Sequence, residues 1–245
     1  EIEAPGLRLD LPPPKHRRLK DFRVAVLVED PNSAVDREYQ AKITALGENS
    51  YRPGATVSFT PKPAFDTVMA FRLYVQLLRS FPFWRSSAAE VERWKAYEQT
   101  LDADDFSYKA LVARSASLTY RDWLSGNEQR HKLRWLWHAF FKDWDVLLCP
   151  AAAGPAFPHD QKGERVDRVI AVNGQPENTC HQLFWAGYSG LCFLPSTVAP
   201  LPLHSSGLPL GVQIVGPHLG DRTTIEFARL IEQEFGGFVP PPGYA

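Results

Sequence analysis

Two short apolar segments, separated by an amphipathic segment, constrain the fold of this chain more than any other feature. Residues 22–28 (FRVAVLV) and 55–59 (ATVSF) are rich in β-branched side chains and suit buried strands. Between them we expect a helix that Ser33 caps and Gly47 ends. Its apolar residues recur at helical spacing on one face: Val35, Tyr39, Ile43 and Leu46. A parallel strand–helix–strand crossover is therefore the predicted opening unit.

The rest of the chain mixes helical and strand patterns, without an internal repeat. Residues 65–142 carry apolar stripes at helical spacing, many of them aromatic, and predict a mainly helical insertion. The remaining elements that we expect are strands at residues 145–150, 169–172, 191–195 and 210–215, a turn at Asn173-Gly174, and helices at residues 179–187 and 223–235. The chain is therefore expected to be of the α/β class.

Charge and cysteine content exclude several classes of function. The 245 residues are 44% hydrophobic and carry a formal net charge of -1, so a core is expected but no basic field for nucleic acid or an anionic membrane. We interpret the basic run at residues 15–20 as a solvated connector. Cys149, Cys180 and Cys192 are odd in number and widely spaced, which disfavours disulfides and favours a reducing cytoplasm. No apolar run approaches the ~20 residues that cross a bilayer.

A search for reactive residues assigns no catalytic group. Ser189 lies in GYSG, which lacks the glycine two residues after the serine of a nucleophile elbow. Ser205 and Ser206 precede Gly207 in a proline-rich connection, where we expect a turn. His138, beside an aromatic residue on a predicted helix, suits a structural role. The sequence contains no HxxxH or HxH pair and no phosphate loop. We therefore expect no bound metal and no nucleotide cofactor.

Several motifs, taken in order, resemble the closing region of the amidase signature family. DVLLCP at residues 145–150 is followed by NG at 173–174, AGYSG at 186–190 and GLPLGVQIVGP at 207–217. The last of these is fairly specific by itself, and its combination with the others strengthens the match. Residues 22–31 are also similar to the strand that follows the catalytic region of that family. The resemblance therefore extends over the whole chain.

The resemblance implies the C-terminal part of the amidase-signature fold, with a mixed, mostly parallel sheet flanked by helices. Residues 1–245 would be a partial single domain. Family members hydrolyse carbon–nitrogen amide bonds with a serine nucleophile, a second serine in a cis peptide bond and a lysine, which lie earlier in the family's order. No lysine here is followed by a matching glycine- and serine-rich segment, so no catalytic residue is transferred. We expect a small-molecule amide substrate and the N-terminal half of the same enzyme as partner, with a homodimer left open.

Three residues are expected to contact substrate: Trp185, Tyr188 and Thr197. They lie close to predicted strand ends and loops, and ligands of open α/β sheets bind beyond strand carboxyl ends. Packing in the core or in a loop is the alternative role for each of them.

Three functions remain open on the sequence alone. The first is a cytoplasmic amidase whose catalytic residues lie upstream, since the chain begins at Glu1 and its single methionine is the internal Met69. In that case the chain alone is predicted to be inactive. The second is a non-catalytic binding or scaffold module that keeps the fold. The third is an amidotransferase A-type subunit, which the near-neutral charge disfavours because that class acts on charged tRNA.

Overall fold

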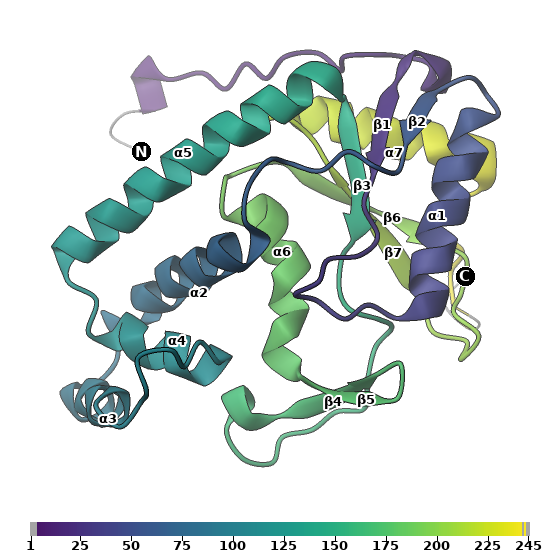
Figure 1. Cartoon of the computed structure of the whole chain (residues 1–245). Coiled ribbons are helices and arrows are strands. Elements are labelled where there is room, and N and C mark those ends of the chain that lie inside the picture. The colour runs from purple at the N-terminus through teal and green to yellow at the C-terminus, as the bar shows by residue number, and fades with distance from the viewer. Residues whose placement is uncertain (1–3, 242, 244–245) are drawn as a thin grey trace.

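A five-stranded mixed sheet organises the chain in the computed structural model, which describes residues 4–241 and 243 (Figure 1). The strand order is β2-β1-β3-β7-β6, and β4 and β5 form a separate hairpin. The strands are β1 (Arg23–Val26), β2 (Thr56–Ser58), β3 (Val146–Pro150), β4 (Val169–Val172), β5 (Gln175–Asn178), β6 (Ser196–Leu201) and β7 (Leu210–Val215). The helices are α1 (Arg37–Tyr51), α2 (Thr67–Phe83), α3 (Ala88–Glu98), α4 (Tyr108–Ala116), α5 (Tyr120–Asp143), α6 (Leu183–Gly190) and α7 (Asp221–Phe235).

The expected parallel crossover opens the sheet. β1 pairs in parallel with β2, with Arg23 opposite Thr56, and with β3, with Val24 opposite Val146. The other two pairings, of β7 with β3 and with β6, are antiparallel. The predicted mixed sheet flanked by helices is therefore confirmed, but its parallel pairings are confined to β1, β2 and β3. The reason is that β6 and β7 are joined by a short connection, which permits only antiparallel pairing.

Helix α1 begins and ends at positions other than those expected. Asp36, rather than Ser33, caps it, and its carboxylate accepts a hydrogen bond from the backbone N–H of Tyr39 at 2.8 Å. Gly47 lies inside the helix instead of ending it. A Cβ atom at that position would lie 2.9 Å from the side chain of Val26, so the glycine is needed for close packing of α1 on β1.

The strand expected at residues 191–195 is a turn instead. After α6 the chain reverses direction: the backbone N–H of Leu194 donates to the carbonyl of Ser189 at 3.1 Å, and Phe193 has a positive φ of 59°. The strand β6 begins only at Ser196, directly after the segment in which a strand was expected. The apolar character of residues 191–195 reflects burial of Leu191, Cys192 and Leu194 rather than strand pairing.

Separate groups of helices cover the two faces of the sheet. Directly paired residues point to the same face, so Val26 and Leu148 share one face while Cys149 and Gln213 share the other. Helix α1 packs on the first face. Helix α6 packs on the second, where Gln213 Nε2 donates to the main-chain carbonyl of Trp185 at 3.1 Å. In Figure 1, α6 and α2 accordingly lie to the left of the strands and α1 to the right.

The mainly helical segment between β2 and β3 comprises α2, α3, α4 and α5. A polar side chain caps the first turn of each helix: Asp66, Ser87, Ser107 and Thr119. Helices α2, α3 and α4 enclose a second apolar cluster apart from the main core, centred on Val75, Trp94 and Tyr108. Within the described part of the chain, no helix combines the length and apolar character needed to cross a membrane.

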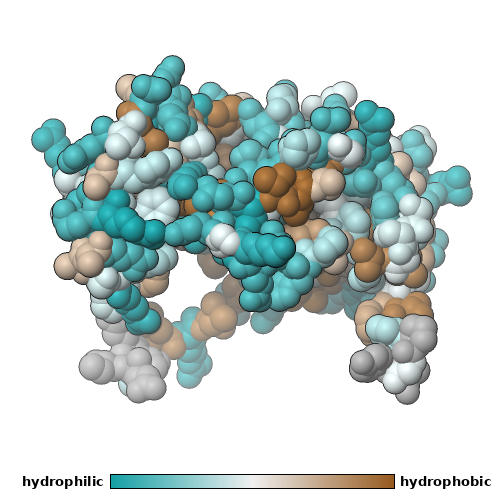
Figure 2. Space-filling view, turned by 90° about the horizontal axis from the view of Figure 1, so that it is seen from below, coloured by the Kyte–Doolittle hydropathy of each residue, from teal (hydrophilic) through white to brown (hydrophobic). Residues whose placement is uncertain are grey.

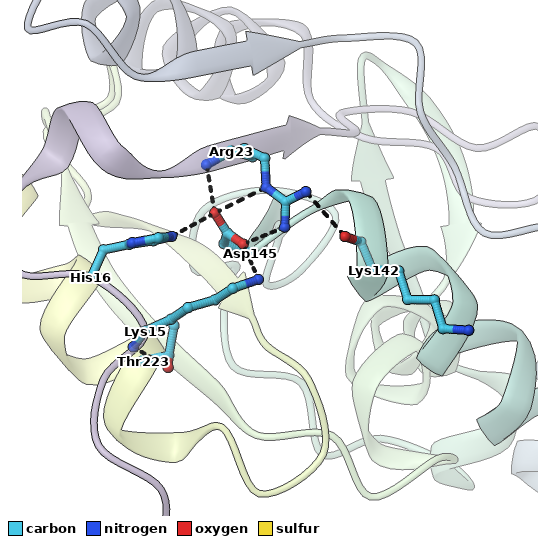
Figure 3. Close-up of polar contacts among 6 residues, drawn as sticks. All are labelled: Lys15, His16, Arg23, Lys142, Asp145 and Thr223. Carbon is cyan, nitrogen blue, oxygen red and sulfur yellow. Dashed lines mark hydrogen bonds and ion pairs between the residues drawn. The ribbon is translucent and has the colours of Figure 1, made fainter.

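A buried carboxylate fixes the N-terminal segment to the sheet (Figure 3). Asp145, directly before β3, is fully buried and accepts hydrogen bonds from the backbone N–H and the Nη2 of Arg23, both at 2.8 Å. His16 Nε2 lies 3.1 Å from the same carboxylate, and the ammonium of Lys15 pairs with it. The backbone N–H of Lys15 also donates to Thr223 Oγ1 in α7 at 3.1 Å. The carboxylate of Asp145 therefore links the start of β3 to β1 directly and to α7 through Lys15.

The basic run at residues 15–20 is consequently more than a solvated connector. That interpretation is wrong for Lys15 and His16, which contact Asp145 because a fully buried carboxylate needs cationic partners. Burial by itself would raise the pKa of Asp145, but the hydrogen bonds from Arg23 and Lys15 outweigh burial and lower it. Arg18 stays exposed and pairs with its neighbour Asp21.

We predict that Asp145→Asn lowers the free energy of unfolding by about 2 kcal/mol at about pH 7, because it leaves buried donors without a charged acceptor. Since folding lowers the pKa of Asp145, its contribution is complete above the unfolded value of about 4 and declines as the pH falls through the folded value. The difference between wild type and variant in urea unfolding should therefore shrink in acid. Asp143→Asn, at an exposed position two residues away, is the control, and an equal loss in both variants would contradict the role of Asp145.

Candidate functional site

The loops beyond the carboxyl ends of β1 and β3 enclose a cavity of about 600 Å³. This edge of an open α/β sheet is where ligands commonly bind, and the volume suits a small molecule. One wall is the loop that follows β3, a second is the β4–β5 hairpin, and a third is the turn between β6 and β7. The polar side chains that line the cavity are Asp36, His159, Asp160, Gln182, His204 and Ser206.

Tyr39 of α1 anchors the loop that follows β3. Its hydroxyl accepts a hydrogen bond from the backbone N–H of Ala151 at 2.8 Å and donates to the carbonyl of Gly211 at the start of β7. Burial raises the pKa of Tyr39 to about 12, so the hydroxyl keeps its proton. The backbone N–H of Ala153 donates to Gln182 Oε1 at 2.8 Å, which ties the same loop to the start of α6. The floor of the cavity is thus held from both faces of the sheet.

A serine, a histidine and a carboxylate meet at the third wall. Ser206 Oγ lies 2.8 Å from His204 Nδ1, and His204 Nε2 lies 3.1 Å from Glu38 Oε2 and 3.6 Å from Asp36 Oδ1. The backbone N–H of Ser205 donates to the other oxygen of Glu38 at 2.8 Å. Hydrogen bonding from Ser205 lowers the pKa of Glu38 to about 2, so this carboxylate stays ionised.

The local geometry assigns this cluster a structural role. The backbone N–H of Ser206 also donates to His204 Nδ1 at 3.1 Å, so the nitrogen that would take the hydroxyl proton already accepts a second donor. That same N–H is therefore turned toward the imidazole and cannot serve an oxyanion beside its own hydroxyl. Gly207, with a φ of 81°, completes the expected turn. His204 and Glu38 together hold this turn against α1.

The three residues predicted to contact substrate divide between the two faces of the sheet. Trp185 and Tyr188 lie together on α6 with their ring centroids 5.5 Å apart, and both are buried in the main core. Thr197 lies opposite Ile214, on the face that α7 covers, and donates to Thr224 Oγ1 at 2.9 Å. The structure therefore does not bring Thr197 to the same site as the two aromatic residues.

Tyr188 and Trp185 both carry a polar group into the core. Tyr188 packs against Phe65 and Trp137, at centroid distances of 6.0 and 5.5 Å, and burial raises the pKa of its hydroxyl. The indole N–H of Trp185 is buried and has no hydrogen-bond partner among the residues that the structure describes. Such a donor suits an acceptor from a substrate or from further polypeptide. The substrate-contact role of the three residues stays a prediction.

Sequence reasoning missed the residues that line the cavity. Asp36, Gln182 and His204 come from three separate segments, and none belongs to a motif with a recognised spacing. The available signal was indirect: Asp36 and Gln182 lie within a few residues of a predicted helix start, and His204 lies in the predicted connection between two strands. The three cysteines are free and buried, and burial raises the pKa of Cys149 and Cys192 to about 12, so they are poor nucleophiles.

We predict that Glu38→Gln loosens the turn between β6 and β7, because the variant loses the charge that holds His204 and weakens the acceptor for Ser205. Amide hydrogen exchange of residues 205–207 should become several-fold faster while exchange in β7 stays unchanged. Glu48→Gln, an exposed carboxylate on the same helix, is the matched control. Unchanged exchange in Glu38→Gln would show that the turn is held by its backbone alone.

Comparisons with known proteins agree with this architecture. The model of the Amidase family matches residues 5–225. An indoleacetamide hydrolase of Bradyrhizobium diazoefficiens is 26% identical over 222 residues, which are 88% of this chain and 38% of that protein. The A-type subunit of a glutamyl-tRNA(Gln) amidotransferase from Brucella ovis is 32% identical over 101 residues, 41% of this chain and 19% of that protein. The chain thus spans less than half the length of these relatives.

Solved structures share the fold. The crystal structure of an amidase superposes with a TM-score of 0.63 at 17% identity, covering 91% of this chain and 47% of that one. The A-type subunit of the glutamyl-tRNA(Gln) amidotransferase from Thermotoga maritima gives a TM-score of 0.63 at 17% identity, covering 98% and 49%. A bacterial aryl acylamidase gives 0.60 at 16% identity, covering 89% and 45%. The family match over residues 5–225 confirms the resemblance carried by the C-terminal motifs: the chain belongs to the Amidase family.

Proposed function

We propose that this chain forms the C-terminal half of an amidase that hydrolyses carbon–nitrogen amide bonds. The observation that carries the proposal is its family membership over residues 5–225 together with coverage of only 45–50% of two solved enzymes, the aryl acylamidase and the 6-aminohexanoate cyclic dimer hydrolase. In this proposal, polypeptide upstream supplies the serine nucleophile, the second serine in a cis peptide bond and the lysine that the family resemblance implies. A small-molecule amide is the substrate.

The cavity at the carboxyl ends of β1 and β3 is the proposed contribution of this half to the substrate pocket. Its floor is rigid because Tyr39 and Gln182 hold the loop after β3. A fixed pocket wall orients an acyl or amine group against a nucleophile, which lowers the entropic part of the barrier. The nucleophile would attack the carbonyl carbon while the lysine takes its proton through the bridging serine. The carbon–nitrogen bond would then break, the proton would pass to the departing amine, and water would hydrolyse the acyl-enzyme.

Exposed apolar side chains support the presence of further polypeptide against this half. β6 pairs only with β7 among the described strands, and its side chain Val198 is 58% exposed although it shares the sheet face of Gln213, on which α6 packs. Leu9 and Val239, near the two ends of the chain, are exposed. Figure 2 shows further apolar residues on the surface between the two projecting terminal segments. Unpaired strand edges and apolar patches of this kind favour association.

A second candidate function is that of an amidotransferase A-type subunit, favoured by the 32% identity to the Brucella ovis protein over 101 residues. The two candidates differ in the substrate that supplies the nitrogen and in what happens to the nitrogen after it is released. An amidase releases ammonia or an amine to water from its amide substrate, whereas a subunit of the second kind would release ammonia from glutamine for transfer.

The first experiment compares residues 1–245 with the complete product of the gene on a panel of aromatic, aliphatic and fatty amides and glutamine. We expect turnover by the complete product and none by residues 1–245. The variant Ser206→Ala of the complete product should still turn over substrate, because Ser206 closes a turn and is not the nucleophile, although its place in the cavity lining allows KM to change. Turnover by residues 1–245 that Ser206→Ala abolishes would overturn the proposal, and a complete product inactive on the whole panel would favour a non-catalytic module.

The second experiment measures the size of residues 1–245 by size-exclusion chromatography with light scattering. We expect a dimer or larger species, because the β6 edge and its apolar face are open. Val198→Lys places a charge on this edge strand and should shift the protein toward monomer. Ile225→Lys, at a position that is 59% exposed on α7, is the matched control. A wild-type chain that elutes as a stable monomer and binds no surface-sensitive dye would contradict the expectation.

A further inference from the structure

A second cavity, of about 440 Å³, lies between helix α5 and the turns that precede β6 and follow β7. Because β7 ends opposite the start of β3, this cavity is at the opposite end of the sheet from the one described above. Its volume falls in the range of small-molecule sites. Its walls are apolar at Trp135, Phe141, Leu194 and Pro217, and the rest of its lining is mainly basic: His131, Arg134, His138 and His218.

Arg134, which lines this cavity, and Arg130, one helical turn earlier on α5, have no carboxylate partner within residues 4–241 and 243. The guanidinium carbons of Arg130 and Arg134 lie 4.4 and 5.5 Å from the ring centroid of Phe193. Arg130 reaches only the side-chain oxygen of Asn127, and its Nε is buried without an acceptor. Burial lowers the pKa of Arg130, and the neighbouring Arg134 lowers it further. The pair therefore lacks the negative charge that arginines so placed normally have.

The hydrogen bonds of His218 leave the charge of Arg134 unneutralised. His218 Nδ1 lies 3.0 Å from the carbonyl oxygen of Phe193, which only accepts, so this nitrogen carries the proton. His218 Nε2 is then an acceptor for Arg134 Nη2 at 3.2 Å. A neutral imidazole thus orients one arm of the guanidinium. The remaining N–H groups of Arg134 are available to a bidentate acceptor such as a carboxylate.

We propose that this cavity binds a small organic anion, with its carboxylate or sulfonate at Arg134 and its aromatic or aliphatic body against Trp135 and Phe141. The concave shape and apolar walls favour a small molecule, since most of a bound ligand's surface is buried in such a site. The proposal does not depend on the amidase function, because no residue of the first cavity takes part in it.

The test uses isothermal titration of residues 1–245 with 2-naphthoate and its neutral, similarly shaped ketone 2-acetylnaphthalene. We expect 2-naphthoate to bind at least about tenfold more tightly than the ketone, as one well-placed charged hydrogen-bonding pair allows. Arg134→Gln should remove this preference, and Trp135→Ala should weaken binding of both ligands. Arg121→Gln, an exposed arginine on the same helix outside the cavity, should keep the wild-type preference.

Equal affinities of the wild type for the two ligands, or no binding of either at millimolar concentration, would overturn the proposal. A preference for 2-naphthoate that survives Arg134→Gln would place the anion elsewhere and overturn it as well. Circular dichroism of each variant checks that the fold is retained. Because Arg134 and Trp135 both reach the surface, their substitution is expected to leave the core packed.

Discussion

The buried charge of Asp145 is the constraint on which the N-terminal part of the fold depends. Removing a carboxylate from water costs several kcal/mol unless all of its oxygens are satisfied. Here the donors come from residues 15–23, which lie about 120 positions earlier in the chain. Satisfying them places β1 beside β3 and brings the N-terminal segment against α7. The parallel half of the sheet is thus specified by a polar contact as well as by its apolar strands.

Local patterns in the sequence predicted most elements, and their failures have identifiable physical causes. Helical spacing located α1, but the cap is Asp36 because Ser33 closes a turn with Asp30, three residues before the cap. Residues 191–195 are apolar because they are buried after α6, so hydrophobicity alone suggested a strand where Phe193 reverses the chain. The partners of Asp145 were beyond reach because no local pattern reports a contact between residues so far apart.

The candidate site shows the same division between what motifs can and cannot predict. The ordered motifs of residues 145–217 predicted the family, and the family match confirms it. The cavity next to these motifs is lined by Asp36, Gln182 and His204. These residues come together only because the starts of α1 and α6 lie close to the β6–β7 turn in the folded chain. Thr197 and Trp185 were both predicted to contact substrate because both lie near predicted strand ends. The alternation of side chains along β6, however, points Thr197 to the face of the sheet that α7 covers, away from Trp185.

The β4–β5 hairpin is separate from the main sheet, and this matters for how the proposed substrate pocket can change its shape. Among the described residues its two strands pair only with each other, and the five-stranded sheet does not include them. Val169 and Ile170, which face the cavity, belong to this hairpin and not to the main core. Selection can therefore remodel one side of the pocket by altering length or residue size there, with little penalty to the scaffold. In the proposed function, a change of amide substrate is therefore compatible with an unchanged five-stranded sheet.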